Sequence, residues 1–428
     1  MKRKPVASAL FAIAVCSIVS MVSAAADAAT PLVTARQKIF GIENVDANTG
    51  AVKKDRVIFS WLSNTSYAVS VLGRVIMLDS YVTRLELTPG RTPFVIQDLV
   101  DLKPEAILLG HGHFDHADNG AYIAKMTGAT IYASPETCDA MQADIARMFA
   151  DPNAINGGAK IIPDGNPVPC MPIVSRGSTP GTEITRLNFL EPLACIIGFK
   201  HMHSNAVSPD SSYPPFVFNV TQDPRDGQMY PRGTSLSPPT NPASRVPGQI
   251  NIATSGSGGP GGPIAMFYEF VLRTPNNFTF AWHNSTGALK EGLAPDGAWG
   301  PAIGQSVFNL FAAIPYVDLE LGSASSANTA NNGHRDIVMY QQYLQPKVFI
   351  PGHMTTGTNG VGESSTQELY FMYRSAQQNI ATVQPVYMPE VRWLVDPTDY
   401  IRPMTYIPGD PRWNNPAKSA RVAQYCGS

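Results

Sequence analysis

The segment His111-Gly112-His113-Phe114-Asp115-His116 is the feature that most constrains what this chain of 428 residues can fold into. It directly follows the apolar run Ala106–Gly110, which has the composition of a buried strand. Ligand sites favour loops at the carboxyl ends of strands. Four imidazole or carboxylate side chains within six positions can turn towards one metal ion or towards two adjacent ions. The sequence therefore predicts a zinc site on a strand and the loop that follows it.

Strands and helices are predicted to alternate around this loop. The strands expected from their apolar pattern are Val57–Phe59, Tyr67–Val71, Val75–Leu78, Thr130–Ala133 and the hairpin of Ala265–Leu272 with Phe278–Trp282. The helices expected are Gly120–Met126 and Pro135–Phe149, the second with Ser134 as its N-cap. Alternation of this kind indicates an α/β layered fold with helices on the outer faces of the sheets.

Between residues 204 and 262 the composition shifts to Pro, Ser, Gly and Asn. A stretch of this length with little regular structure is uncommon inside a compact domain and is usually functional or disordered. We interpret it as an insertion that covers the site, within a single domain spanning residues 29–428. Substrate specificity would depend on the pocket that this insertion lines.

The first residues are typical of a secretory signal peptide. Lys2, Arg3 and Lys4 precede an apolar stretch that ends in small residues. Residues 1–28 are therefore predicted to be removed, which leaves no stable membrane span and a periplasmic or secreted protein. Cys16 is interpreted as an ordinary signal residue, with lipid attachment as the alternative.

Four cysteines follow the predicted signal peptide: Cys138, Cys170, Cys195 and Cys426. An even number in an oxidising compartment predicts one or two disulfides, with the pairing open and buried free thiols as the alternative. The net charge of −2 and the lack of a dense basic cluster after residue 4 argue against nucleic acid as a partner. The expected partner is a small-molecule substrate.

The pattern His-x-His-x-Asp-His after a strand resembles the hallmark of the metallo-β-lactamase superfamily and matches it at every specified position. Trp61–Ser66, followed by Val75–Asp79, resembles the opening hairpin of the branch that contains ascorbate-phosphate lactonases and N-acylphosphatidylethanolamine phospholipases. The resemblance extends over most of the chain from Val57 to Met354. It implies an αββα sandwich, in which two mixed β-sheets are flanked by helices and the metals lie along one edge between the sheets.

The resemblance also implies ligands from two later strand ends. The superfamily supplies a third histidine to the first metal, for which the chain offers His201 and His203. His203 is expected, because the following serine fits the family context, and His201 would then support the ligand from behind. His353, after the strand-like segment Gln345–Gly352, would complete the second metal site beside Asp115 and His116.

One position departs from the family pattern. Asn284 stands where the family usually places an aspartate that bridges the two metals. Asparagine keeps one neutral oxygen but loses the anionic charge, so Asn284 is expected to be a weaker ligand, with either one zinc ion or one tight and one weak ion. His283 is either a compensating ligand or a packed ring, and Asp79 either braces the metal loop or ends a strand. No chemistry is assigned to His334.

The resemblance implies a metal-dependent hydrolase in which metal-activated water attacks a carbonyl or phosphoryl centre and Asp115 orients the water or accepts its proton. The lactonase-like hairpin favours a lactone, an ester or a related small-molecule bond over a β-lactam. No serine-hydrolase elbow and no P-loop occurs in the sequence. Two alternatives stay open: a mononuclear iron dioxygenase of the same fold, and a ligand-binding protein that has lost turnover.

Overall fold

The computed structural model describes residues 29–82, 94–152, 155–156, 159–205, 210, 261–324, 332, 334–353, 366–392 and 402–427. The predicted signal peptide and nearly all of the predicted insertion at 204–262 lie outside the described residues. No helix in these described ranges combines the length and the apolar character that crossing a bilayer requires.

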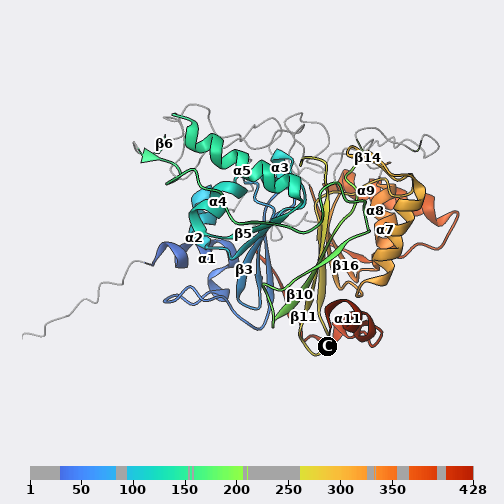
Figure 1. The fold of residues 1–428 in the computed structure, drawn as a ribbon. Helices are drawn as coiled ribbons and strands as arrows, with labels where there is room; N and C mark the ends of the chain where they lie inside the picture. Colours follow the sequence, from blue (N-terminus) through green and yellow to red (C-terminus); the bar gives the residue numbers. More distant parts are fainter. Residues whose placement is uncertain are drawn as a thin grey trace, which may run out of the picture.

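Two seven-stranded sheets lie face to face (Figure 1). In spatial order, the first sheet contains β18 (Met404–Tyr406), β1 (Val57–Ser63), β2 (Ser66–Val71), β3 (Arg74–Leu78), β4 (Ala106–Leu108), β5 (Thr130–Ala133) and β8 (Cys170–Pro172). The second contains β17 (Glu390–Val391), β16 (Val348–Gly352), β15 (Leu319–Ser323), β12 (Thr279–His283), β11 (Met266–Leu272), β10 (Ala194–Lys200) and β9 (Ile184–Leu187). Both sheets mix parallel and antiparallel pairs.

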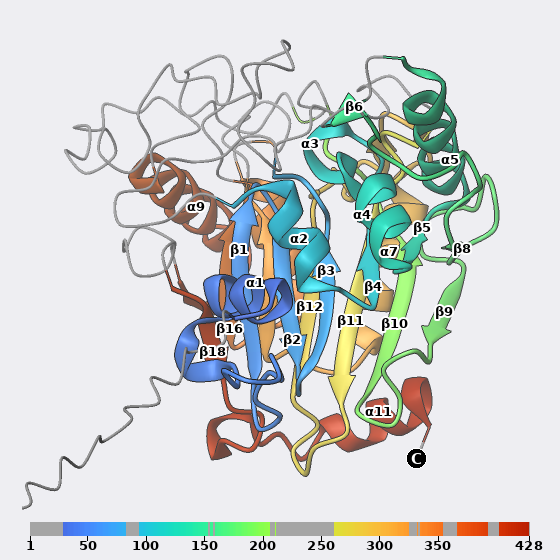
Figure 2. The same cartoon turned by 90° about the vertical axis from the view of Figure 1, so that its left-hand side faces the viewer.

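Helices cover the outer face of each sheet, as Figure 1 shows. Those on the first sheet are α1 (Pro31–Phe40), α2 (Ile96–Leu102), α4 (Gly120–Thr127) and α5 (Pro135–Ala150), and Figure 2 looks onto this face. Those on the second sheet are α7 (Pro301–Ala313), α8 (Arg335–Leu344) and α9 (Thr366–Ala381). The short α3 (Phe114–Ala117) lies at one end of the sandwich and α11 (Lys418–Cys426) at the other. The predicted αββα sandwich is confirmed.

Shorter elements complete the described chain. They are the 3₁₀ helices η1 (Ile42–Asn44) and η4 (Pro411–Trp413), the strand pair β6 (Ile155–Asn156) and β7 (Ala159–Lys160), and the pair β13 (Leu293–Ala294) and β14 (Gly297–Ala298). None of them contributes a candidate ligand.

Aromatic side chains fill the space between the two sheets. Phe59 of β1 meets Phe280 of β12 edge-on, with ring centroids 5.0 Å apart, and Phe270 of β11 stacks on Phe280 at 4.3 Å. Alternate residues of β11 point the other way, so Phe267 packs under the helices of the second sheet. Each fully buried phenylalanine contributes roughly 1.5–3 kcal/mol to stability, which gives the ligand loops a rigid support.

The predicted local elements agree with the structure, and one cap shows why. Pro135 begins α5, and the Ser134 hydroxyl accepts a hydrogen bond of 3.1 Å from the backbone N–H of Thr137. This contact satisfies one of the N–H groups that the first turn of a helix leaves without a partner. The prediction of disulfides is also confirmed, with both bridges formed: Cys138–Cys170 and Cys195–Cys426.

Candidate metal centre

The loops that carry the candidate ligands emerge at one edge of the sandwich. β3, β4 and β5 run parallel in the first sheet, and β12, β15 and β16 run parallel in the second. β10 has the same direction as β12, because both are antiparallel to the intervening β11. The carboxyl ends of parallel strands meet at the same edge of a sheet. The loops after β4, β10 and β16 can therefore bring together residues that are far apart in sequence.

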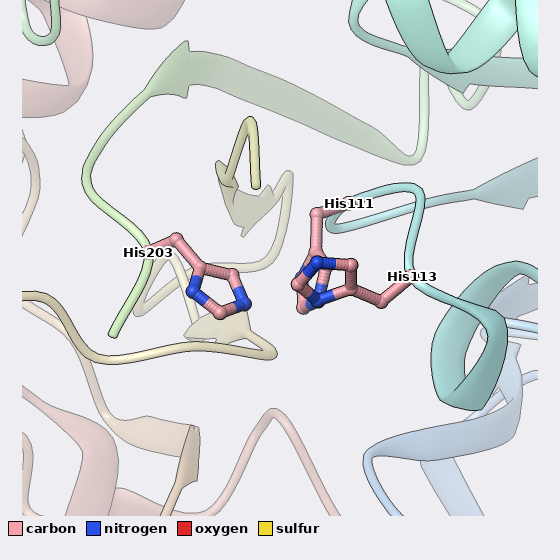
Figure 3. A group of neighbouring side chains, drawn as sticks. All are labelled: His111, His113 and His203. Carbon is pink, nitrogen blue, oxygen red and sulfur yellow. The ribbon is translucent and has the colours of Figure 1, made fainter. Parts of the chain in front are cut away.

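Three histidines form the first group of candidate ligands. The nearest ring nitrogens of His111, His113 and His203 lie within 4.8 Å of one another. Their ring centroids are 4.5–4.7 Å apart in every pair. Figure 3 shows His203 facing the other two rings across the site, from the loop after β10. The separation suits three nitrogens around a single divalent ion.

Hydrogen bonds fix which nitrogen faces the centre of this group. The Nδ1 atom of His111 lies 2.7 Å from Oδ1 of Asn284, and Nδ1 of His203 lies 2.6 Å from the backbone oxygen of Ser204. Because both partners are acceptors, both Nδ1 atoms carry the proton and both Nε2 atoms keep a lone pair. Nε2 of His111 is buried and has no hydrogen-bond partner in the described part of the chain. A buried lone pair of this kind fits a metal ion.

Electrostatics keep these rings neutral. Burial, with the neighbouring rings of His116, His203 and His113, lowers the pKa of His111 well below its usual value. Burial and the neighbouring His113 lower the pKa of His203 to about 3. Neutral imidazole is the form that binds metal, so His111 and His203 are ready to act as ligands across the physiological pH range.

Asp115, His116 and His353 form the second group, whose ligand atoms also lie within 4.8 Å of one another. Oδ2 of Asp115 is 3.5 Å from Nε2 of His116 and 3.4 Å from Nε2 of His353. Burial opposes the charge of Asp115, but the two histidines outweigh it and hold the pKa of this carboxyl below its usual value. The ring centroids of His116 and His111 are 4.1 Å apart, so the two groups adjoin.

Asp79, at the end of β3, holds the second group from behind. Its Oδ2 accepts hydrogen bonds from Nδ1 of His116 (2.8 Å) and from the hydroxyl of Thr65 (2.9 Å). Burial would lower the pKa of His116, but the carboxylates of Asp115 and Asp79 raise it overall. The proton on Nδ1 leaves Nε2 of His116 to face the site. Of the two interpretations of Asp79, the structure therefore favours the one in which it braces the metal loop.

Asn64, in the turn between β1 and β2, is a site residue that sequence reasoning missed. Its side-chain Nδ2 donates to the backbone oxygen of Asp115 at 2.8 Å and to Oδ2 of Asp115 at 3.1 Å. Its own backbone oxygen accepts from the N–H of His353 at 3.1 Å. One residue thus holds two members of the second group. The available signal was its place in the hairpin Trp61–Ser66, which already resembled the family.

The strand order and the site together identify the fold. Two facing sheets lie between layers of helices, and the His-x-His-x-Asp-His loop meets His203 and His353 from the second sheet at one edge. The chain has the metallo-β-lactamase fold. In this metallo-β-lactamase fold, six side chains from three loops supply five imidazoles and one carboxylate, a donor set that fits zinc.

Sequence comparisons find partial matches to curated proteins that share one name. No family model matches the chain. It is 30% identical over 125 residues to a protein from Pyrobaculum arsenaticum named UPF0173 metal-dependent hydrolase, in a match covering 28% of this chain and 53% of that protein. A protein of the same name from Ligilactobacillus salivarius is 33% identical over 72 residues, covering 17% of this chain and 30% of that one. The chain thus spans about half the length, or less, of these curated relatives.

Two solved structures with distant likeness carry related descriptions. One is a metallo hydrolase from Ignicoccus hospitalis, at 12% identity and a TM-score of 0.43, covering 82% of this chain and 98% of that one. The other is a metallo-β-lactamase fold protein from Bacillus subtilis, at 10% identity and a TM-score of 0.37, covering 79% and 96%. The assignment of the metallo-β-lactamase fold rests on the strand order and site of this chain itself.

The remaining predicted residues belong to neither ligand group, and the expected support of His203 comes from the backbone oxygen of Ser204 and not from His201. His201 is buried, and its Nδ1 is 3.0 Å from the hydroxyl of Tyr340, outside the first group. His283 lies between Oε1 of Glu320 at 3.0 Å and the backbone oxygen of Ser285 at 2.8 Å, so both ring nitrogens have partners and the structure favours a packed ring.

Asn284 was expected to be a ligand, and the structure places it differently. Its oxygen faces Nδ1 of His111 at 2.7 Å, and its Nδ2 lies 2.9 and 3.1 Å from the carboxylate oxygens of Asp79. With both ends of the amide engaged by protein atoms, Asn284 lies behind the ligands rather than between them.

Proposed function

We propose that this protein is an exported zinc-dependent hydrolase that cleaves a lactone, an ester or a related small-molecule bond. The observation that carries the proposal is the convergence of His111, His113 and His203 from two different sheets. Hydrogen bonds hold the Nδ1 atoms of His111 and His203, and the buried Nε2 of His111 has no hydrogen-bond partner among the described residues. The relatives named metal-dependent hydrolases support the reaction class.

The residues of the two groups would hold zinc, which would supply a bound water with a pKa of about 7 and polarise the bond under attack. Asp115 would orient this water, since it belongs to the second group, which adjoins the first, and its lowered pKa keeps the carboxylate ionised and able to accept a hydrogen bond. Asn64 holds the Asp115 carboxylate in place. Such positioning of the carboxylate and the water accounts for a substantial part of the rate in enzymes of this kind.

The donor set supports zinc as the metal. Imidazole suits zinc, copper, iron and nickel, whereas magnesium and calcium prefer sites made of oxygen atoms. The two groups provide room for one or two ions, and Asp115 is the single carboxylate among their six members. We therefore propose zinc, with the ion of the His111 group bound more tightly than the ion of the Asp115 group.

Export of the protein is supported by two independent features. The amino-terminal residues have the charge and apolar pattern of a secretory signal peptide. Both disulfides, Cys138–Cys170 and Cys195–Cys426, are of a kind that persists in oxidising compartments. We place the mature protein in the periplasm or outside the cell, with a small molecule as its substrate.

The test combines elemental analysis with a hydrolysis panel. Protein purified without added metal is expected to contain zinc and to hydrolyse at least one of a lactone, an aryl ester, a phosphodiester and a β-lactam. His111→Ala is expected to abolish both the bound zinc and the hydrolysis, whereas the control His201→Ala keeps both in its folded fraction. Hydrolysis that survives His111→Ala, or inactivity of the zinc- and manganese-loaded protein on every substrate, would overturn the proposal. Iron with oxygen consumption on a persulfide would replace hydrolysis by dioxygenase chemistry.

A further inference from the structure

The side chain of Asn284 lies at the junction of the two ligand groups, although it follows β12 in the second sheet. It is 1% exposed, and its Oδ1 lies 2.7 Å from Nδ1 of His111. Its Nδ2 lies 2.9 Å from Oδ2 and 3.1 Å from Oδ1 of Asp79. Only an NH₂ group can donate to the Asp79 carboxylate, so the amide orientation is determined and its oxygen must face the imidazole.

This orientation fixes the state of His111. Because Oδ1 of Asn284 can only accept a hydrogen bond, His111 must carry its proton on Nδ1, and the lone pair of Nε2 then points into the first group. On the other side, Asp79 accepts from Nδ1 of His116 at 2.8 Å. A continuous chain of hydrogen bonds therefore runs from His111 through Asn284 and Asp79 to His116, and it joins the two ligand groups.

The backbone leaves room for the amide at this point. A Cβ atom at Gly110 would lie 2.2–2.3 Å from the Cγ, Oδ1 and Nδ2 atoms of Asn284. Any residue other than glycine there would displace the carboxamide, since real Cβ atoms do not approach other atoms so closely. The N–H of Gly110 also donates to Oδ1 of Asp79 at 3.0 Å. Gly110 thus permits the contact between the amide and the metal loop.

We infer that Asn284 is a positioning residue that couples the two metal sites through hydrogen bonds to His111 and Asp79, and that it does not bridge the ions as a ligand. The inference rests on the proposed metal centre. A carboxylate at position 284 would face the carboxylate of Asp79 at about the 3 Å spacing of the present contact, where like charges repel strongly. The neutral amide avoids this repulsion, and it can donate and accept at the same time.

Three variants of the full chain test the inference through metal affinity, measured by competition with a chelator, and through unfolding of the metal-free protein. Asn284→Ala is expected to weaken zinc binding roughly 10- to 100-fold, the usual effect of losing a residue that orients a metal ligand. Asn284→Asp is expected to weaken it as well and to lower the melting temperature of the metal-free protein. The exchange Asn284→Asp with Asp79→Asn removes one of the two facing charges and should restore part of both losses.

A matched control separates this role from ordinary burial. Asn44 is also a buried asparagine, with Nδ2 donating to the backbone oxygen of Phe40 at 2.8 Å and Oδ1 accepting from Arg56 at 3.3 Å. Asn44→Ala is expected to lower the melting temperature without changing zinc affinity. The absorption spectrum of the cobalt-substituted protein should change for Asn284→Ala and stay as in the wild type for Asn44→Ala.

Metal binding by the wild type tests the proposed function, and metal binding by the variants at position 284 tests the positioning role. A wild-type protein that binds no metal would remove the proposed function itself. Metal binding by the wild type, with equal affinity in Asn284→Ala, would overturn the positioning role alone. An additional ion or tighter binding in Asn284→Asp would show that position 284 acts as a ligand, contrary to the inference.

Discussion

Asp79 accepts a hydrogen bond of 2.8 Å from Nδ1 of His116, and this contact ties the end of β3 to the loop that carries four of the six candidate ligands. The Asp79 carboxylate is fully buried. Its other donors are the hydroxyl of Thr65, the N–H of Gly110 and the amide of Asn284. A buried carboxylate that accepts this many hydrogen bonds holds the surrounding segments in place and also supplies a negative charge beside the ligands.

Replacing Asp79 by alanine is therefore expected to affect stability and metal binding together. Several buried donors would lose their acceptor, which costs roughly 2–4 kcal/mol in the free energy of unfolding. His116 would lose its orientation, so zinc affinity should fall roughly 10- to 100-fold. Denaturant unfolding of the metal-free protein and chelator competition measure the two effects. The control is Asp139→Ala, because the ion pair of Asp139 with Arg176 is exposed to solvent and contributes little. Unchanged zinc affinity in Asp79→Ala would contradict the bracing role.

The two histidines near the end of β10 are expected to respond differently to substitution. His203 belongs to the first ligand group, whereas His201 is buried beside Tyr340. His203→Ala should therefore lose the zinc ion with little change in the melting temperature of the metal-free protein. His201→Ala should keep the zinc and lower the melting temperature, because it leaves a cavity and a polar partner without its contact. Elemental analysis and thermal unfolding of both variants decide the assignment, and retained zinc in His203→Ala would reverse it.

The parts of the site that could be predicted from sequence are those encoded locally. His111, His113, Asp115 and His116 fall within six residues, and the apolar strand before them places them at a sheet edge. The capped start of α5 is likewise a short-range signal, because Ser134 and Thr137 are three residues apart. Each of these features depends on neighbours in the chain, so no knowledge of tertiary packing was needed.

The contacts that could not be predicted join residues distant in sequence. Asn284 is 173 positions from His111, and its amide fits only because Gly110 has no side chain. Gly112 is a similar case: its sequence context suggests flexibility, but a Cβ there would lie 2.7 Å from the backbone oxygen of Gly261. The strand β18 was also missed, since its three residues carry no alternation long enough to recognise.

Reduction of the disulfides should destabilise the protein to different extents. Cys138–Cys170 closes a separation of 32 residues and Cys195–Cys426 one of 231. The chain-entropy relation gives about 4 kcal/mol for the first and about 5 kcal/mol for the second. Cys138→Ala/Cys170→Ala and Cys195→Ala/Cys426→Ala should both unfold at lower denaturant concentrations than the wild type, the second pair at the lowest. Equal stability of wild type and both pairs in denaturant would mean that the bridges do not form in solution.

Glu269, in the middle of β11, predicts a pH dependence of stability. Its side chain is fully buried, and neither carboxyl oxygen has a hydrogen-bond partner among the described residues. Burial raises the pKa of this carboxyl well above its usual value, although Lys418 and Arg421 oppose the rise and Asp318 adds to it. The folded protein therefore keeps a proton that the unfolded chain has already released. The stabilisation that Glu269 contributes is fully present below the pKa that it has in the unfolded chain. It is lost as the pH rises through the higher pKa that it has in the folded protein.

Glu269→Gln removes this titration and keeps the shape of the side chain. At pH 8 the free energy of unfolding of the variant is expected to exceed that of the wild type by about 1 kcal/mol or more. Folding of the wild type at this pH requires either a buried charge or the uptake of a proton, and each is unfavourable. At pH 4 the two proteins should differ little, because Glu269 is protonated in the folded state and mostly protonated in the unfolded state. Glu390→Gln, at an exposed position, should show no such difference. Denaturant unfolding of the three proteins at both pH values measures the effect. A gain for Glu269→Gln that is equal at pH 4 and pH 8 would mean that packing, and not the proton, causes it.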